Sequence, residues 1–151
     1  MNRTPLVMQF DQILQGWDIP TPAGVLRVRE DKRAAVPAGA PYSILTNLAH
    51  AVLWQDFWLQ KLAGGRRKAG PSEWNNDFRV PDPSEWHALK KRLLEGLQEA
   101  RRIAASEPFD HEMVSDQEAI ETLIRILVHV SYHLGQMNLL RGLVRRADQR
   151  R

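Results

Sequence analysis

The hydrophobic positions of this chain recur at helical spacing in several long runs. Apolar residues return every three or four positions over three stretches, at about 42–63, 83–106 and 115–146, and this spacing buries one face of an α-helix. Two shorter runs come first, one opening at Thr4-Pro5 and one running from Thr21-Pro22 to about Ala35. No useful length of strand alternation occurs. The pattern therefore predicts an all-α protein, a four-helix bundle with a short extra N-terminal helix.

Local signals place the ends of these helices. Residues 82–85 and 115–118 each carry a capping residue followed three positions later by glutamate, which is typical of a helix start. Gly64 is expected to end the helix that opens near Ser43. From Arg66 to Pro81 the prolines, glycine and paired asparagines indicate an irregular segment, and its aromatic residues Trp74 and Phe78 are expected to anchor it to the core.

Composition limits the class of protein. A length of 151 residues suits one domain, spanning residues 1–151. No 18-residue apolar stretch and no signal-like N-terminus occur, so we expect no membrane association and a cytoplasmic location. A net charge of +3 makes nucleic acid an unlikely partner. Arginines gather from Arg141 onward, and a solvated helix end, where cations complement the helix dipole, is favoured there over phosphate binding.

Cysteine is absent, which excludes disulfides, thiolate metal sites and a cysteine nucleophile. Any thiol chemistry would need a thiol from a small molecule. The sequence also lacks a glycine-rich phosphate loop and a nucleophile elbow. These absences direct attention to the histidines.

His129 and His133 lie one helical turn apart in an apolar run, and His50 lies in an earlier run with similar surroundings. A spacing of four residues gives a rise of about 6 Å and an offset of roughly 40°, so both rings leave one helix face. Three imidazoles with an open position are typical of a catalytic metal. The alternative is that they are hydrogen-bonded core residues. His87 and His111 are expected on the surface and in an exposed loop.

Two familiar histidine geometries do not fit. The zinc-protease pattern needs glutamate directly after the first histidine, and Val130 stands there. Carboxylate-rich di-iron bundles need Glu-x-x-His pairs, and the corresponding positions hold Ile126 and Val130.

Two stretches stand out as motifs: one runs from Ile44 to Trp54 and contains His50, and the other runs from His129 to Gln136. Both resemble motifs of the DinB-like (YfiT-like) family of metalloenzymes. The resemblance covers nearly the whole chain. It implies a four-helix bundle, often a homodimer, with a divalent metal (zinc or nickel) on His50, His129 and His133. Characterised relatives include thiol-dependent S-transferases and a thiol-dependent isomerase that use low-molecular-weight bacterial thiols.

These features favour a metal-dependent enzyme, a thiol-dependent transferase or a hydrolase, that acts on a small electrophilic molecule. A divalent cation would lower the pKa of a water or thiol ligand. Trp54, Phe57 and Tyr132 are candidate pocket walls, although Tyr132 could face a neighbouring helix. Gln136 could hydrogen-bond behind a ligand or serve only packing. The alternative function is a non-catalytic, metal-stabilised helical dimer that acts as a stress-related binding module.

Overall fold

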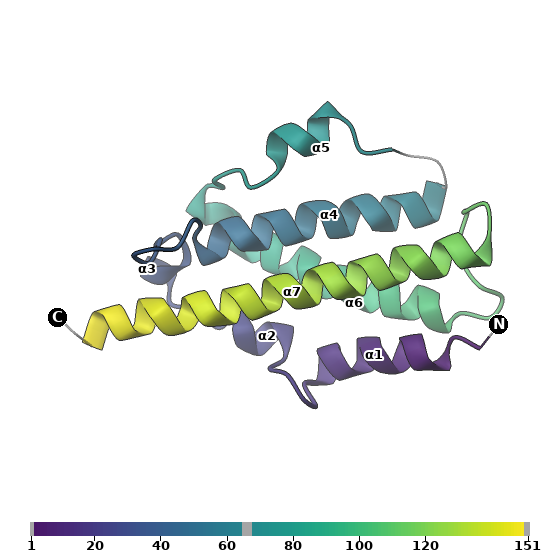
Figure 1. The fold of residues 1–151 in the computed structure, drawn as a ribbon, viewed down its shortest axis with the longest axis horizontal. Helices are drawn as coiled ribbons and strands as arrows, with labels where there is room; N and C mark the ends of the chain where they lie inside the picture. The colour runs from purple at the N-terminus through teal and green to yellow at the C-terminus, as the bar shows by residue number, and fades with distance from the viewer. Residues whose placement is uncertain (1, 65–67, 150–151) are drawn as a thin grey trace.

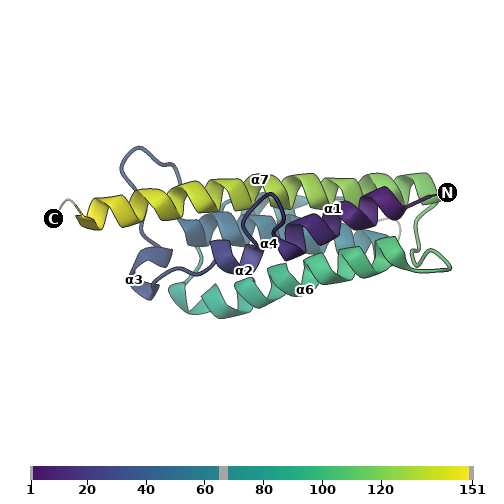
Figure 2. The ribbon, with the colours of Figure 1, turned by 90° about the horizontal axis from the view of Figure 1, so that it is seen from below.

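The long helices lie side by side along the long axis of the protein (Figure 1). The computed structural model describes residues 2–64 and 68–149. The bundle consists of α1 (Thr4–Gln15), α4 (Ile44–Gly64), α6 (Trp86–Ala105) and α7 (Asp116–Gln149). Helix α4 contacts both α6 and α7, and α1 closes the bundle against the same two helices (Figure 2). The described residues contain no strand, so the all-α prediction is confirmed.

The core of the bundle is apolar and continuous from one end to the other. Its fully buried members come from all four long helices and include Phe10, Leu48, Leu93, Leu97, Leu123, Ile126 and Met137. Helix α4 is buried over most of its first half because two helices cover it. This central position buries polar side chains in the first half of α4, such as Asn47 and His50.

Helix starts agree with the predicted signals at three positions. Thr21 Oγ1 accepts a hydrogen bond from the Gly24 N–H, and Ser115 Oγ accepts one from the Glu118 N–H. At Asp82 both halves of the capping box form, ahead of a short 3-10 turn, η1 (Pro83–Glu85), that leads into α6. These bonds satisfy N–H groups that a helix start leaves without partners.

The prediction of a single helix from Thr21 to Ala35 is wrong. The structure has two short helices there, α2 (Pro22–Val25) and α3 (Glu30–Arg33). Arg141 of α7 donates hydrogen bonds to the carbonyls of Gly24 and Val25, at 2.5 and 3.4 Å. A continued helix would use those carbonyls for the N–H groups of residues 28 and 29. The Arg141 guanidinium therefore supplies the hydrogen bonds that the N–H groups of the next helical turn would otherwise donate.

The segment expected to be irregular contains a helix, α5 (Pro71–Asn76). The Glu73 carboxylate accepts a hydrogen bond from the Gly70 N–H at 2.8 Å, which fixes the start of this helix. Proline at its first position and glutamate at its third were the available signals. Residues 66 and 67 of the predicted segment lie outside the described residues.

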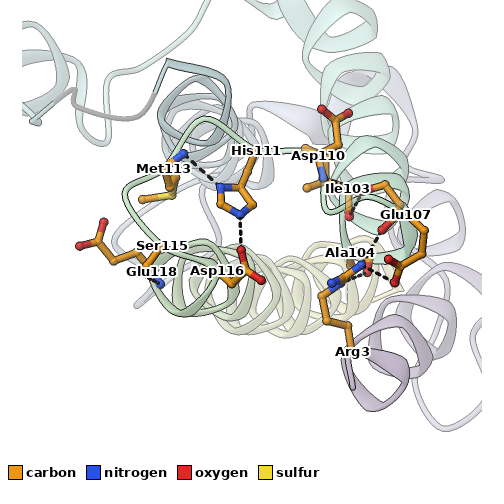
Figure 3. A network of polar contacts seen from close by, with 11 residues as sticks. Arg3, Ile103, Ala104, Glu107, Asp110, His111, Met113, Ser115, Asp116 and Glu118 are labelled. Carbon is orange, nitrogen blue, oxygen red and sulfur yellow. Dashed lines mark hydrogen bonds and ion pairs between the residues drawn. The ribbon is translucent and has the colours of Figure 1, made fainter. Parts of the chain in front are cut away.

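The connection between α6 and α7 is held by a polar network (Figure 3). Arg3 donates to the Ala104 and Ser106 carbonyls and pairs with Glu107. His111 accepts from the Met113 N–H through Nδ1 and contacts Asp116 through Nε2, each at 3.1 Å. Its side chain is only 8% exposed, so the expected exposed position is wrong. The exposed position of His87 is confirmed.

We expect Gly96→Ala to destabilise the protein by about 1–3 kcal/mol. A Cβ at Gly96 would lie 2.0 Å from Gln55 Nε2. Gln55 is fully buried and donates to the Arg92 carbonyl at 3.1 Å, so its amide cannot move without losing that bond. Urea unfolding measures the change.

The matched control is Gly135→Ala, because a Cβ at Gly135 meets nothing within 4 Å. That substitution should leave stability unchanged or raise it by up to about 1 kcal/mol through helix propensity. Equal effects of the two substitutions would contradict the close packing of α4 against α6.

Candidate metal centre

Three histidines from two helices meet inside the bundle. His50 of α4 and His129 and His133 of α7 each present a ring nitrogen, and these three atoms lie within 4.8 Å of one another. The Nε2 atoms of His50 and His129 are 3.1 Å apart. His133 packs between them, with ring centroids 4.4 Å from His50 and 4.5 Å from His129. The predicted convergence of the three rings is therefore present.

The pairing of α4 with α7 brings these rings together (Figure 1). On α7, Ile126, Val130 and Met137 are fully buried around the two histidines. Burial of these apolar residues turns the same face of α7 toward α4. His50 and His133 are buried with it, and His129 is half-buried at the edge.

Asp77, in the connection after α5, lies directly behind His50. Its Oδ1 is 2.5 Å from His50 Nδ1 and accepts a hydrogen bond from Trp54 Nε1 at 3.0 Å. An ionised carboxylate has no proton to donate. The contact lacks the angle of a regular hydrogen bond, but a carboxylate this close favours the proton of neutral His50 on Nδ1, which leaves the Nε2 lone pair facing the other two histidines.

Asn47 performs the equivalent role for His133. Its Oδ1 lies 3.1 Å from His133 Nδ1, in a buried position. An amide oxygen only accepts hydrogen bonds, so Nδ1 of His133 donates and its Nε2 carries the lone pair. Oriented by these partners, two of the three rings direct acceptor nitrogens inward, which is the arrangement common behind metal-ligating histidines.

Burial keeps all three imidazoles neutral at physiological pH. Desolvation, reinforced by the neighbouring histidines, lowers the pKa of His129 to about 3. Desolvation and the nearby His50 lower the pKa of His133 to about 4, against a smaller opposing effect of Gln136. Desolvation also lowers the pKa of His50, although Asp77 opposes it. Neutral imidazole is the form that binds a metal.

The donor set fits a divalent cation. Lone pairs of neutral rings converge from both helices, and the Nε2 atoms of His50 and His129 are only 3.1 Å apart. Close approach of imidazole acceptors in a desolvated place costs free energy unless something is shared between them. A cation ligated by nitrogen would satisfy all three at once.

Aromatic rings cover the cluster on the α5 side. Phe78 stacks on His50 with a centroid distance of 3.8 Å, and Tyr42 stacks on Phe78 at 4.3 Å. Phe78 has a φ of 51°, a left-handed conformation that costs a residue with a Cβ about 1 kcal/mol or more. The two stacking contacts hold the ring over His50 in spite of that cost.

The other predicted site residues are spread around the cluster. Trp54 and Phe57 are buried, with ring centroids 5.7 Å apart, and Trp54 contacts the site through Asp77. Tyr132 is 63% exposed, and its ring lies edge-on to His133 at 5.1 Å, on the solvent side. Gln136 follows one turn after His133, and its buried Oε1 has no hydrogen-bond partner within the described part of the chain.

Sequence reasoning missed Asn47, Asp77 and Phe78. Asn47 had a usable signal, because it precedes His50 by three residues in a predicted helix and so shares its face. Phe78 was expected only to anchor its segment to the core, and Asp77 had no signal, because the path of this segment back across the bundle depends on tertiary contacts.

A cavity of about 260 Å³ lies beside the cluster. Asn47 and Gln136 supply its polar groups near the histidines, and the rest of its lining comes from the 38–42 loop and from Leu139, Leu140 and Leu143. None of the three histidines lines it directly. The cavity offers an apolar space one residue layer away from His133.

The metal-free protein should lose stability as the pH falls from about 6.5 to about 4. Histidines of the unfolded chain titrate near 6.5, whereas His129 and His133 stay neutral in the fold until about pH 3 and 4. The unfolded state therefore binds more protons in this window. The free energy of unfolding decreases as the pH decreases through the window, and it does not change with pH above about pH 7.

Urea unfolding in chelator at several pH values measures this dependence. The double variant His129→Gln/His133→Asn should show a shallower slope below pH 6.5, whereas His87→Gln should keep the original slope because His87 is exposed. A double variant with an unchanged slope would contradict the lowered pKa values.

Comparison with known proteins adds a family assignment to this geometry. The family model described as DinB superfamily matches residues 22–137, a range that includes all three histidines and both helices that carry them. No curated protein and no solved structure gives a significant match. Because the matched range covers well over half of the sequence, the chain belongs to the DinB superfamily.

Proposed function

We propose that this protein binds one divalent metal ion, zinc or nickel, through His50, His129 and His133, and uses it to catalyse a thiol-dependent transfer or a hydrolysis on a small electrophilic molecule. The observation that carries the proposal is the convergence of three ring nitrogens within 4.8 Å. Three neutral protein ligands leave coordination positions open, as in catalytic rather than structural sites.

When bound, the cation would supply Lewis acidity and lower the pKa of a water or thiol ligand. The residues of the chain supply orientation. Asp77 and Asn47 hold protons on the Nδ1 atoms of His50 and His133, so both rings keep their Nε2 atoms available. Phe78 and Trp58 pack against the rings of His50 and His129 and exclude water from those sides.

The thiol and the substrate would both be small molecules. The chain has no cysteine, so a sulfur nucleophile would come from a low-molecular-weight thiol. The apolar cavity beside Asn47 and Gln136 would accept the hydrophobic part of a small electrophile one residue layer away from the histidines. The half-buried edge at His129 gives solvent and reactants a way in.

A second candidate function is a non-catalytic, metal-stabilised dimer that serves as a binding module. Its support is a row of exposed apolar residues on α7, with Ile124, Val128, Tyr132 and Leu139 between 44% and 63% exposed. Such a row at helical spacing is a surface that a second copy of the chain could cover. Homodimer formation stays a prediction for both candidate functions.

None of the helices in the described part of the chain combines the length and the apolar character that a membrane span requires.

Untagged protein should bind about one zinc or nickel ion per chain. His50→Ala and His133→Ala should each abolish tight binding, because two remaining imidazoles make a far weaker site, whereas His87→Ala should bind normally. Elemental analysis after dialysis, with chelator-competition titrations, measures both quantities. Metal retained equally by all variants would place the ion elsewhere and refute the site.

Catalysis is tested on the same preparations. Metal-loaded protein with a small thiol and a haloarene or activated ester should show turnover that His133→Ala lacks. Metal binding that raises the melting temperature without turnover on any thiol or ester substrate would favour the binding module.

Asp77→Asn should weaken metal affinity by about 10- to 100-fold, the range typical of a lost carboxylate behind a ligating histidine. The amide keeps the shape of the side chain but not its charge, so His50 becomes a poorer donor. Chelator-competition titration measures the affinity. Asp110→Asn, which changes an exposed carboxylate paired with Arg102, is the control and should bind normally. Equal affinities for the two variants would refute the role of Asp77.

A further inference from the structure

A second cavity, of about 440 Å³, lies between α7 and the stretch that contains α2 and α3. Seven residues line it: Arg27, Val28, Arg29, Lys32, Arg141, Val144 and Arg145. Five of these side chains are cations, the other two are valines, and no lining residue is acidic. The cavity thus differs in chemistry from the apolar space beside the histidines.

The cations come from two distant parts of the sequence. Arg27, Arg29 and Lys32 lie on the α2–α3 stretch, more than 100 residues before Arg141 and Arg145. Contacts between α2 and α7 bring the two groups together (Figure 2). The sequence pattern was interpreted as a solvated C-terminal helix end, which concerns only the arginines of α7. That interpretation does not explain why Arg27, Arg29 and Lys32 lie beside them.

An acid pairs with two of the five cations, and the other three have no acidic partner among the described side chains. Asp31 pairs with Arg29 at 3.1 Å and with Lys32 at 3.6 Å, and neighbouring Glu30 is exposed. Among the described side chains, no carboxylate forms an ion pair with Arg27, Arg141 or Arg145. The chain as a whole carries only +3, so the concentration of cations here does not reflect a general excess of basic residues.

Another charged cavity in the same protein is balanced. It is lined by Lys61 and Arg125 together with Glu118 and Glu121, so cations and acids face each other. Cations gathered without acids repel one another, and this repulsion is relieved when an anion binds among them.

Part of the basic cavity is fixed in place before any ligand arrives. Arg141 donates to the carbonyls of Gly24 and Val25 and to Asn138 Oδ1. These bonds hold its guanidinium between α7 and α2. A pre-positioned guanidinium loses less conformational entropy when it binds a further acceptor than a free one does.

We propose that this basic cavity is a binding site for a small phosphate-bearing molecule, separate from the histidine centre. Planar guanidinium groups match the oxygens of a phosphate in paired hydrogen bonds. The volume falls within the range of small-molecule sites, and Val28 and Val144 provide an apolar wall for the organic part of a ligand. The cavity begins about 12 Å along α7 from His133, at Arg141.

Inorganic pyrophosphate is the probe for the test, in calorimetric titrations at about 0.15 M salt. We expect saturable binding to the full chain, with affinity reduced about tenfold or more in Arg27→Gln/Arg145→Gln. Both arginines are exposed, so the double variant should keep the melting temperature of the unliganded protein. Arg125→Gln is the matched control: it removes an exposed arginine of α7 far from the cavity and should leave affinity unchanged.

Two further arms separate this cavity from the histidine centre and from a surface that docks polymeric or membrane phosphates. His129→Gln should bind pyrophosphate normally, and loss of binding there would assign the anion to the histidine centre and overturn the proposal. Anionic phospholipid vesicles and a short DNA duplex form the second arm, and tighter Arg27-dependent binding to either than to pyrophosphate would also overturn it. No saturable binding, or an equal loss in Arg125→Gln, would refute a specific small-anion site.

Discussion

The central constraint of this structure is the burial of three imidazoles between α4 and α7. A bundle core supplies few hydrogen-bond partners, so each ring nitrogen placed there must be matched by another group. The structure matches two of them, through Asp77 for His50 and Asn47 for His133. One nitrogen of each ring then lies close to the other two, so the candidate metal site is built from buried polar atoms, whereas Nδ1 of His129 has no hydrogen-bond partner among the described residues.

The buried imidazoles also determine the position of residues outside the helices. Asp77 reaches His50 only because α5 and the residues after it return across the face of α4. Phe78 adopts a left-handed backbone conformation in the next position and places its ring between Tyr42 and His50. The connection from residue 68 to residue 81 is thus part of the site rather than a spacer between helices.

The sequence predicted what depends on local periodicity. The long helices, the capping boxes and the shared face of His129 and His133 all follow from spacings of three and four residues. The addition of His50 to that pair rested on its similar apolar surroundings and on the resemblance to the DinB-like motifs. The prediction failed where a distant residue decides local structure. Arg141 ends α2 from more than 100 residues away, and the burial of His111 depends on the Asp116 side chain and the Met113 backbone.

Helix α7 links the features that the sequence could not connect. Its start is held by the His111 and Ser115 contacts, its middle carries two of the three histidines, and its C-terminal half contributes Arg141 and Arg145 to the basic cavity. Arg141 also fixes the break between α2 and α3 that places Arg27 and Arg29 beside α7. Buried imidazoles that lack hydrogen-bond partners and clustered cations both cost free energy in the folded protein. A cation bound by the histidines would give their inward nitrogens a partner. An anion bound by the arginines would reduce the repulsion among them. Each ligand would therefore stabilise the fold at a place where the unliganded protein carries a cost in free energy.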